Sequence, residues 1–174
     1  KFDIIGFDVC LEGMVEVVYE LQDVSRAIIA SQVTEPGGGW PYTPILTYLR
    51  DNINTTIDSF AARIVIEYDS SYSEVVTQAA FRTNQCANIL TKVDNLATAL
   101  INSSDWNFIK NCRAAAQEMD DGDDSGGNNS GIDLYDWTEI ISRSSDGAVV
   151  AAAASLKSSL SDKSFIIEAK TAQA

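Results

Sequence analysis

The feature that most constrains the fold is the order of apolar patterns at the start of the chain. Residues 2–7 (FDIIGF) form a short apolar, β-rich run, and residues 11–24 (LEGMVEVVYELQDV) carry apolar side chains at helical spacing. Residues 26–31 (RAIIAS) read as a second buried strand. This order predicts a βαβ unit, which has parallel strands and a right-handed crossover. We therefore expect an α/β fold with a mostly parallel sheet flanked by helices.

The remainder of the chain continues the alternation of helices and strands. Its patterns predict helices over residues 44–54, 55–69, 84–101, 105–118, 136–143 and 148–160, and strands over residues 74–81 and 164–169. The acidic, glycine-rich run 120–131 (DDGDDSGGNNSG) is too polar to pack, and we predict a flexible loop there. With 174 residues and 45% apolar composition, the chain is long enough for one sizeable core.

Two loops lie where ligands bind in such sheets, at the carboxyl ends of the strands. The first is Asp8-Val9-Cys10, and the second is residues 34–42 (TEPGGGWPY), which is rich in glycine and proline. Cys10 stands where the strand gives way to the predicted helix, so backbone N–H groups and the helix dipole would favour its thiolate. This position suggests a nucleophile, although a free cysteine is more often a small buried apolar side chain.

Histidine is absent from the sequence. A cysteine peptidase requires a general base and acid, usually a histidine, within hydrogen-bonding reach of the thiol. Either Cys10 is not catalytic, or its partner lies on a separate polypeptide. Lys1 opens directly into the first strand, so we expect an N-terminal part to have been removed or to lie in another chain.

The charge balance argues against nucleic acid as a partner. The formal net charge is −13 and the sequence pI is near 4.2, whereas phosphate binding demands a surface rich in Lys and Arg. A negative protein attracts basic peptides, but the same charge also serves solubility. No stretch reaches the length of a membrane span. The three cysteines do not form a disulfide scaffold, and we expect Cys86 and Cys112 to be buried in helices rather than bridged.

The run FDIIGFDVCLEGMVEVVYEL, followed by IIASQVTEPGGGWPY, resembles the nucleophile region of the clostripain family of cysteine peptidases, relatives of caspases, gingipains and legumain. Residues 132–141 (IDLYDWTEII) are similar to a downstream segment of the family. The resemblance implies a caspase-haemoglobinase-like fold, with residues 1–174 as the nucleophile-bearing C-terminal part of a single peptidase domain. It also implies that Cys10 is the nucleophile of a Cys–His dyad in a cysteine endopeptidase that cleaves after Arg or Lys.

The resemblance further implies a partner chain. The catalytic histidine would come from a companion N-terminal chain, after proteolytic maturation of one precursor into two associated chains. Substrates would be peptides or proteins with a basic P1 residue, the residue that precedes the cleaved bond. The enzyme would be a secreted or cell-surface bacterial protein. The alternative function is that of an inactive caspase-like domain that binds peptides or acts as a scaffold.

The resemblance assigns four residues to substrate binding. Asp8, two residues before the nucleophile, would form the floor of the S1 pocket and select Arg or Lys; its alternative role is an N-terminal helix cap. In the second loop, Thr34 and Glu35 would lie nearest the substrate and Trp40 would supply a hydrophobic wall. Alternatively, this loop is a structural turn with Trp40 packed in the core.

These assignments require no cofactor. Asp121, Asp123 and Ser125 alternate in the acidic run as in a calcium loop, but the twelfth position is Ile132 rather than glutamate. Some members of the resembled family depend on calcium. A calcium site therefore remains an alternative to an ordinary surface loop.

Overall fold

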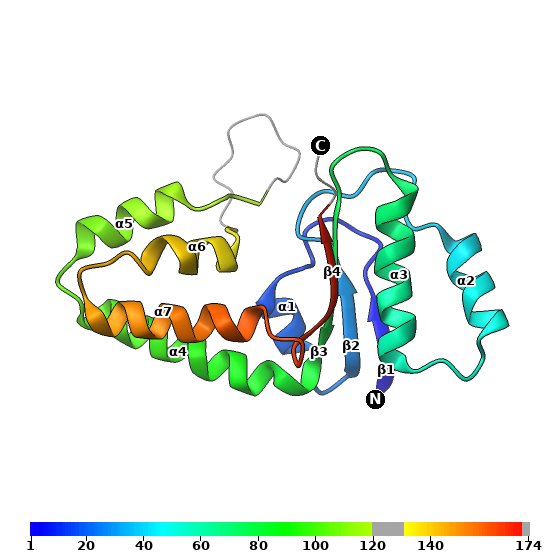
Figure 1. Cartoon of the computed structure of the whole chain (residues 1–174), viewed down its shortest axis with the longest axis horizontal. Helices are drawn as coiled ribbons and strands as arrows, with labels where there is room; N and C mark the ends of the chain where they lie inside the picture. The colour runs from blue at the N-terminus through cyan, green and yellow to red at the C-terminus, as the bar shows by residue number, and fades with distance from the viewer. Residues whose placement is uncertain (120–130, 172–174) are drawn as a thin grey trace. The chain divides into compact units, whose positions relative to one another are not determined.

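A computed structural model describes residues 1–119 and 131–171. The chain divides into two compact units. The first unit contains Lys1–Cys86 and Lys163–Ala174, and the second contains Ala87–Asp162. In sequence, the second unit is therefore an insertion between the last two strands of the first (Figure 1).

The first unit is built on a four-stranded sheet with the strand order β1-β2-β3-β4. The strands are β1 (Phe2–Gly6), β2 (Ser25–Ala30), β3 (Thr77–Arg82) and β4 (Ile166–Thr171). β1 and β2 are parallel, with Ile4 opposite Ala27, and α1 (Val15–Glu20) connects them. The predicted βαβ unit is confirmed.

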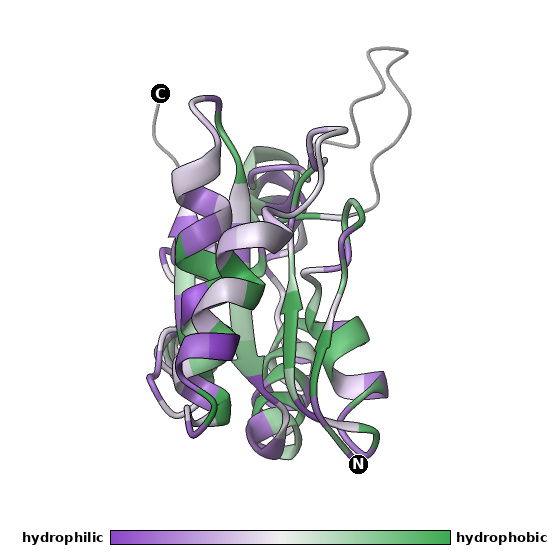
Figure 2. Cartoon of the chain, turned by 90° about the vertical axis from the view of Figure 1, so that its right-hand side faces the viewer, coloured by the Kyte–Doolittle hydropathy of each residue, from purple (hydrophilic) through white to green (hydrophobic). Residues whose placement is uncertain are grey.

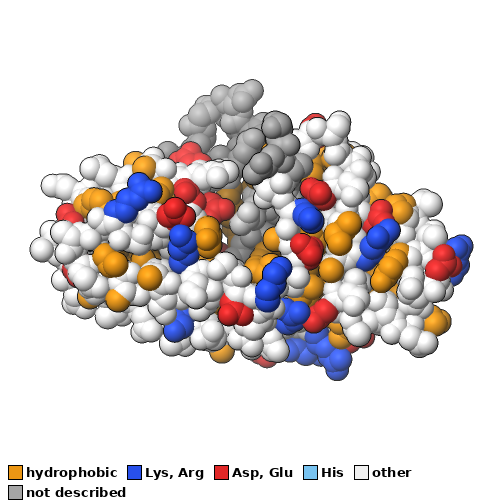
Figure 3. Space-filling model, viewed as in Figure 1, with side chains coloured by type: hydrophobic (Ala, Val, Ile, Leu, Met, Phe, Trp, Pro, Cys, Tyr) orange, Lys and Arg blue, Asp and Glu red, His pale blue; other side chains and the backbone are white. Residues whose placement is uncertain are grey.

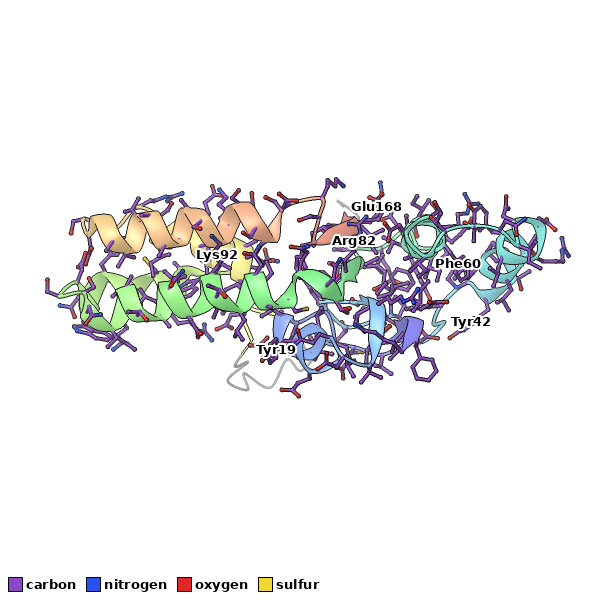
Figure 4. The ribbon with its side chains drawn as sticks, turned by 90° about the horizontal axis from the view of Figure 1, so that it is seen from below. Tyr19, Tyr42, Phe60, Arg82, Lys92 and Glu168 are labelled. Carbon is purple, nitrogen blue, oxygen red and sulfur yellow. The ribbon has the colours of Figure 1, made fainter. Side chains whose placement is uncertain are left out.

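The sheet is mixed rather than mostly parallel. β3 runs antiparallel to β2, and β4 runs antiparallel to β3. The connection from β2 to β3 contains two helices, α2 (Tyr42–Asp51) and α3 (Ile57–Ser71), which lead away from the carboxyl edge of β2 and back to it (Figure 1). Because two helices return the chain to the edge that it left, β3 must run in the opposite direction. The α/β class, with helices on both sides of the sheet, is confirmed (Figures 1 and 4).

α3 packs across the sheet through one apolar stripe. Its buried residues, Ala61, Ile64, Val65 and Tyr68, recur at three- and four-residue spacing. Thr56 caps the helix by accepting a hydrogen bond from the N–H of Ser59. A buried cluster joins this stripe to the sheet and to α2, and contains Ile29, Trp40, Ile45, Ala61, Ile64, Val65, Tyr68, Val76 and Ala80. Burial of each large aliphatic side chain contributes roughly 1.5–3 kcal/mol, so this core fixes the strand ends from which the loops emerge.

The outer side of α2 and α3 carries charged side chains of both signs together with exposed apolar ones such as Leu46 and Ile66. In Figure 2 the strands are mostly hydrophobic, whereas the helices in front of them alternate hydrophilic and hydrophobic residues. Acidic and basic side chains are interspersed over α2 and α3 on the face seen in Figure 3. Arg63 and Glu67 form an ion pair there, one helical turn apart.

The second unit is helical. Its helices are α4 (Cys86–Asn102, whose first residue belongs to the first unit), α5 (Trp106–Ala115), α6 (Leu134–Ile141) and α7 (Gly147–Leu160). Asp133 and Asp146 cap α6 and α7 by accepting hydrogen bonds from backbone N–H groups. The helices predicted in this unit are confirmed to within a few residues, and residues 120–130 of the predicted flexible loop 120–131 lie outside the described residues. In residues 1–119 and 131–171 no helix has the length and apolar character needed to cross a membrane.

Candidate active site

The loops that follow β1 and β2 are joined by hydrogen bonds at the carboxyl edge of these strands. The N–H of Phe7 donates to the carbonyl of Ile29 at 2.9 Å, and the N–H of Gly13 donates to the carbonyl of Ser31 at 2.7 Å. The Ser31 hydroxyl in turn shares a 3.0 Å hydrogen bond with the hydroxyl of Thr77 on β3. The two predicted loops therefore lie side by side and are anchored to three strands.

The backbone just after Cys10 makes a tight turn. Leu11 has a φ of 65°, a conformation uncommon for a residue with a side chain. Gly13 is buried, and a Cβ atom there would lie 2.7 Å from the carbonyl carbon of Ser31 and 2.8 Å from the nitrogen of Gln32. Only glycine allows the two loops to approach this closely.

Replacing Gly13 by alanine is expected to destabilise the protein by about 1–3 kcal/mol, because the added methyl group meets backbone atoms that cannot move aside cheaply. Urea denaturation measures the loss. Gly37→Ala is the matched control, since a Cβ atom at Gly37 meets nothing within 4 Å. Equal stability of the two variants would contradict a tight contact at Gly13.

Cys10 is exposed at this edge. Its sulfur accepts a hydrogen bond from the backbone N–H of Glu35 at 3.2 Å, so the second loop contacts the thiol directly. The helix predicted over residues 11–24 is wrong in length, because α1 begins at Val15 with Met14 as its N-cap. The donor that faces the sulfur thus comes from the neighbouring loop, and the expected placement of Cys10 at a helix N-terminus is not observed.

Asp8 points its carboxylate toward the second loop. The hydroxyl of Tyr42 donates to Asp8 Oδ2 at 2.8 Å. A Cβ atom on Gly39 would lie 3.0 and 3.1 Å from the two Asp8 oxygens, and Gly39 has a φ of 63°, so both space and backbone conformation favour glycine there. Asp8 is not the cap of α1, whose N-cap position is Met14.

Glu35 is half-buried and holds its carboxyl group among polar side chains. Glu35 Oε1 accepts hydrogen bonds from Trp40 Nε1 at 3.3 Å and from Gln78 Nε2 at 3.4 Å. Glu35 Oε2 is buried and has no hydrogen-bond partner within residues 1–119 and 131–171. The nearby Asp8 carboxyl acts on Glu35 electrostatically and disfavours its charged form. The two predicted acidic residues are therefore brought together.

The surroundings of Glu35 favour its protonated form. Burial, together with the nearby Asp8 carboxyl, raises the pKa of Glu35 from 4.5 to about 7, although the hydrogen bonds from Trp40 and Gln78 oppose the change. Neither Asp8 nor Glu35 forms an ion pair with Lys or Arg in the part of the chain that the structure describes. The site is thus an uncompensated acidic pair beside an exposed thiol.

Trp40 lies in the core rather than on an open wall. Its side chain is 8% exposed, and its ring packs so closely on β1 that a Cβ atom on Gly6 would lie 2.5 Å from it. The indole N–H nevertheless holds Glu35 in place. Thr34 is partly exposed directly before Glu35. Contacts of Thr34 and Trp40 with substrate stay predictions.

Several polar residues at the site were not expected from the sequence. Tyr42, labelled in Figure 4, begins α2. Its hydroxyl donates a hydrogen bond to Asp8, and the hydroxyl of Tyr72 donates to the Gly39 carbonyl at 2.6 Å. Tyr68 is fully buried in the core, and its hydroxyl has no partner among the described residues. Tyr42 ends the 34–42 run, and Gln78 is a polar residue in the predicted strand 74–81, so the sequence gave a signal for these two residues. Tyr68 gave none, because it reads as an ordinary position of the predicted helix 55–69, and Tyr72 gave none, because it lies between that helix and the predicted strand 74–81.

The other two cysteines are buried and free, as predicted. Burial raises the pKa of Cys86 to about 11 and also raises that of Cys112. No group of His, Cys, Asp or Glu suited to hold a metal occurs within residues 1–119 and 131–171. The calcium-loop alternative at Asp121, Asp123 and Ser125 lies outside these residues.

A family model described as the clostripain family matches residues 1–173. The chain belongs to the clostripain family. This finding confirms the resemblance carried by the two loops, and it places the exposed Cys10 and the acidic pair within a family of cysteine peptidases. A search of curated proteins finds no match.

Solved structures of proteases share this fold. An inactive zymogen protease from Parabacteroides distasonis matches with a TM-score of 0.74 and 19% identity, over 98% of this chain and 44% of its own. A clostripain from Bacteroides thetaiotaomicron, in complex with the peptide inhibitor BTN-VLTK-AOMK, matches with a TM-score of 0.71 and 20% identity, over 99% of this chain and 69% of its own. A secreted cysteine protease from the same organism matches with a TM-score of 0.71 and 20% identity, over 99% of this chain and 44% of its own. This clostripain-family chain thus spans less than half the length of two of these relatives.

Proposed function

We propose that this chain is the nucleophile-bearing part of a cysteine endopeptidase that cleaves peptide bonds after Arg or Lys. The observation that carries the proposal is the exposed thiol of Cys10 beside two carboxyl groups that have no cationic partner in the described residues. Membership in the clostripain family supports the same chemistry.

In the proposed reaction, the Cys10 thiolate attacks the carbonyl carbon of the basic P1 residue. The Cys10 N–H helps to bind the oxyanion of the tetrahedral intermediate. The leaving amine takes a proton from the imidazolium of a partner histidine. Its departure leaves the acyl-enzyme, a thioester on Cys10. Water then attacks the thioester, and the imidazole takes its proton, so that the acid product leaves and the thiol is restored. The backbone N–H of Glu35, 3.2 Å from the Cys10 sulfur, donates a hydrogen bond to this atom and would stabilise its thiolate form.

The acidic pair is proposed to bind the P1 side chain. A carboxylate attracts a guanidinium or ammonium much more strongly than it tolerates an apolar group. Both residues lie close to Cys10. Asp8 precedes it by two residues, and the backbone N–H of Glu35 donates a hydrogen bond to the Cys10 sulfur. The inhibitor bound to the Bacteroides relative carries the peptide VLTK, which ends in lysine, and this agrees with a basic P1 residue.

The general acid and base is proposed to be a histidine from a companion N-terminal chain, since this sequence contains no histidine. One relative is described as an inactive zymogen, which supports maturation by proteolytic cleavage into two associated chains. Another is described as secreted, which supports a secreted or cell-surface location.

Treatment of the full-length protein with BTN-VLTK-AOMK is expected to modify Cys10 covalently. Peptide mapping by mass spectrometry should find the label on Cys10 and not on Cys86 or Cys112, whose thiols are buried. The same reagent with alanine in place of lysine is the control, and it should label at least about tenfold more slowly because it lacks the charge. Labelling at another cysteine, or an equal rate with both reagents, would count against the proposal.

A further inference from the structure

We propose that Gln78, on β3, is a positioning residue for the nucleophile: it holds the Glu35 side chain, and thereby keeps the Glu35 backbone N–H on the Cys10 sulfur. This inference rests on the proposed function and deepens it, because it assigns part of the reactivity of the thiol to a strand that does not carry the nucleophile. Gln78 would therefore affect reactions of the thiol that involve no P1 side chain at all.

Gln78 is a polar residue on an apolar face of β3. Alternate side chains of a strand share a face, so Gln78 lies on the same face as Ala80, which belongs to the buried cluster that joins α3 to the sheet. Gln78 itself is 1% exposed. A buried amide costs free energy unless it is hydrogen-bonded, so an apolar side chain of the same length would serve the core at least as well. The presence of an amide therefore calls for a partner outside the apolar core.

The amide of Gln78 is directed at Glu35. Gln78 Nε2 donates a hydrogen bond to Glu35 Oε1 at 3.4 Å, and Trp40 Nε1 donates to the same oxygen at 3.3 Å. Gln78 Oε1, by contrast, is buried without a hydrogen-bond partner in the part of the chain that the structure describes. The Glu35 carboxyl is thus held from two sides, by the second loop itself and by β3.

β3 holds the loop after β2 at two successive residues. Thr77 Oγ1 accepts a hydrogen bond from the backbone N–H of Gln32 at 3.1 Å, and it also shares a hydrogen bond with the hydroxyl of Ser31. Gln78, the next residue of the strand, holds Glu35 three positions further along the loop. Because the loop is fixed at both points, its backbone has little freedom to carry the Glu35 N–H away from the sulfur.

The backbone N–H of Glu35 connects this anchoring to the nucleophile. It donates to Cys10 Sγ at 3.2 Å. A hydrogen bond to a charged acceptor is stronger than one to a neutral acceptor, so an N–H kept in this place favours the thiolate, which is the reactive form. Cys10 is exposed, and water competes for both partners of the bond as soon as the loop moves. The contact therefore depends on how firmly the Glu35 side chain is held.

Alkylation of the full-length protein with iodoacetamide tests the inference, because this reagent reports the reactivity of the thiol and carries no P1 side chain. Gln78→Met keeps the length of the side chain but removes the amide donor. We expect alkylation of Cys10, followed by mass spectrometry of its peptide, to slow by about threefold near neutral pH, since the smaller thiolate fraction is partly offset by a more nucleophilic thiolate. The urea midpoint of unfolding should stay equal or rise, because an apolar group replaces a buried amide.

Gln85→Met is the matched control, since it makes the same substitution in the turn Thr83–Gln85 beyond the other end of β3. It should leave the alkylation rate unchanged. Glu35→Ala removes the anchored side chain but keeps the N–H, and it should slow alkylation at least as much as Gln78→Met. Adding Gln78→Met to Glu35→Ala should then slow it no further, because Gln78 acts through the Glu35 side chain. Gln78→Leu, which also lacks the donor, replaces Gln78→Met if that variant does not fold.

An alkylation rate unchanged by removal of the Gln78 amide, or by Glu35→Ala, would overturn the inference. Equal slowing by Gln78→Met with and without the Glu35 side chain would also overturn it, and would assign Gln78 a general structural role. In each of these cases, continued cleavage of Arg-containing peptides would leave the proposed function intact. Failure of the proposed function would instead appear in the wild type, as absence of both cleavage and labelling by BTN-VLTK-AOMK.

Discussion

Replacing Cys10 by alanine is expected to lower kcat/KM for a fluorogenic peptide with P1 arginine by at least about 10⁴-fold in the full-length protein. The methyl group of alanine cannot form the acyl-enzyme, and the other two cysteines, Cys86 and Cys112, are buried and cannot replace the thiol. Substrate should still bind, because the acidic pair is untouched. Steady-state kinetics measure the loss, and binding of n-butylguanidine, which has the charged group of an arginine side chain, measures what remains.

Val9→Ala is the matched control for this experiment. Val9 precedes the nucleophile, but its side chain is 51% exposed, so its truncation should change kcat/KM by only a small factor. If the Cys10→Ala protein retained the activity of the control, Cys10 would not be the nucleophile and the proposed mechanism would be wrong.

Replacing Asp8 by asparagine is expected to lower kcat/KM for substrates with P1 arginine or lysine by about 100-fold. Loss of one charged hydrogen bond costs about 1.5–3 kcal/mol, and each 1.4 kcal/mol is a factor of ten. Asparagine keeps an oxygen that can accept the hydrogen bond of Tyr42, and it fits against Gly39 as aspartate does. Substrates with an uncharged P1 residue should be affected much less, which a panel of P1 variants measures.

Asp3→Asn serves as the control for lost charge alone. Asp3 lies on β1, the strand that precedes Asp8, and forms an exposed ion pair with Arg26 at 3.3 Å. Solvent therefore screens the charge of Asp3. We expect its kinetics to match the wild type. An equal loss across all P1 residues in Asp8→Asn would assign Asp8 a structural role in place of substrate selection.

The sequence predicted the elements that depend on local pattern. The β1–α1–β2 order, the apolar stripe of α3 and the helices of the second unit follow from apolar periodicity, and all are observed. The direction of β3 did not follow from the two helices predicted between it and β2, because it depends on how those helices pack against each other and against the sheet. The position at which α1 begins also could not be predicted, because the close approach of Gly13 to Ser31 is a contact between separate segments.

The candidate site divides in the same way. Asp8 and Cys10 share one loop, so their proximity follows from the chain itself. The hydrogen bond from Glu35 to the sulfur and the bond from Tyr42 to Asp8 join residues 25 and 34 positions apart, and they depend on the packing of two loops. The burial of Trp40, Tyr68 and Gln78 depends on the assembled core, which periodicity alone does not reveal.

The insertion between β3 and β4 begins and ends at neighbouring points of one sheet. The N–H of Arg82 donates to the carbonyl of Phe165 at 2.8 Å, so the chain leaves and re-enters the first unit across a single ladder position. Once these two strands pair, the ends of the intervening segment are already closed, and each doubling of its length adds only about 0.6 kcal/mol of entropic cost. A change in the length of that helical segment is therefore expected to cost the pairing of β3 and β4 little free energy.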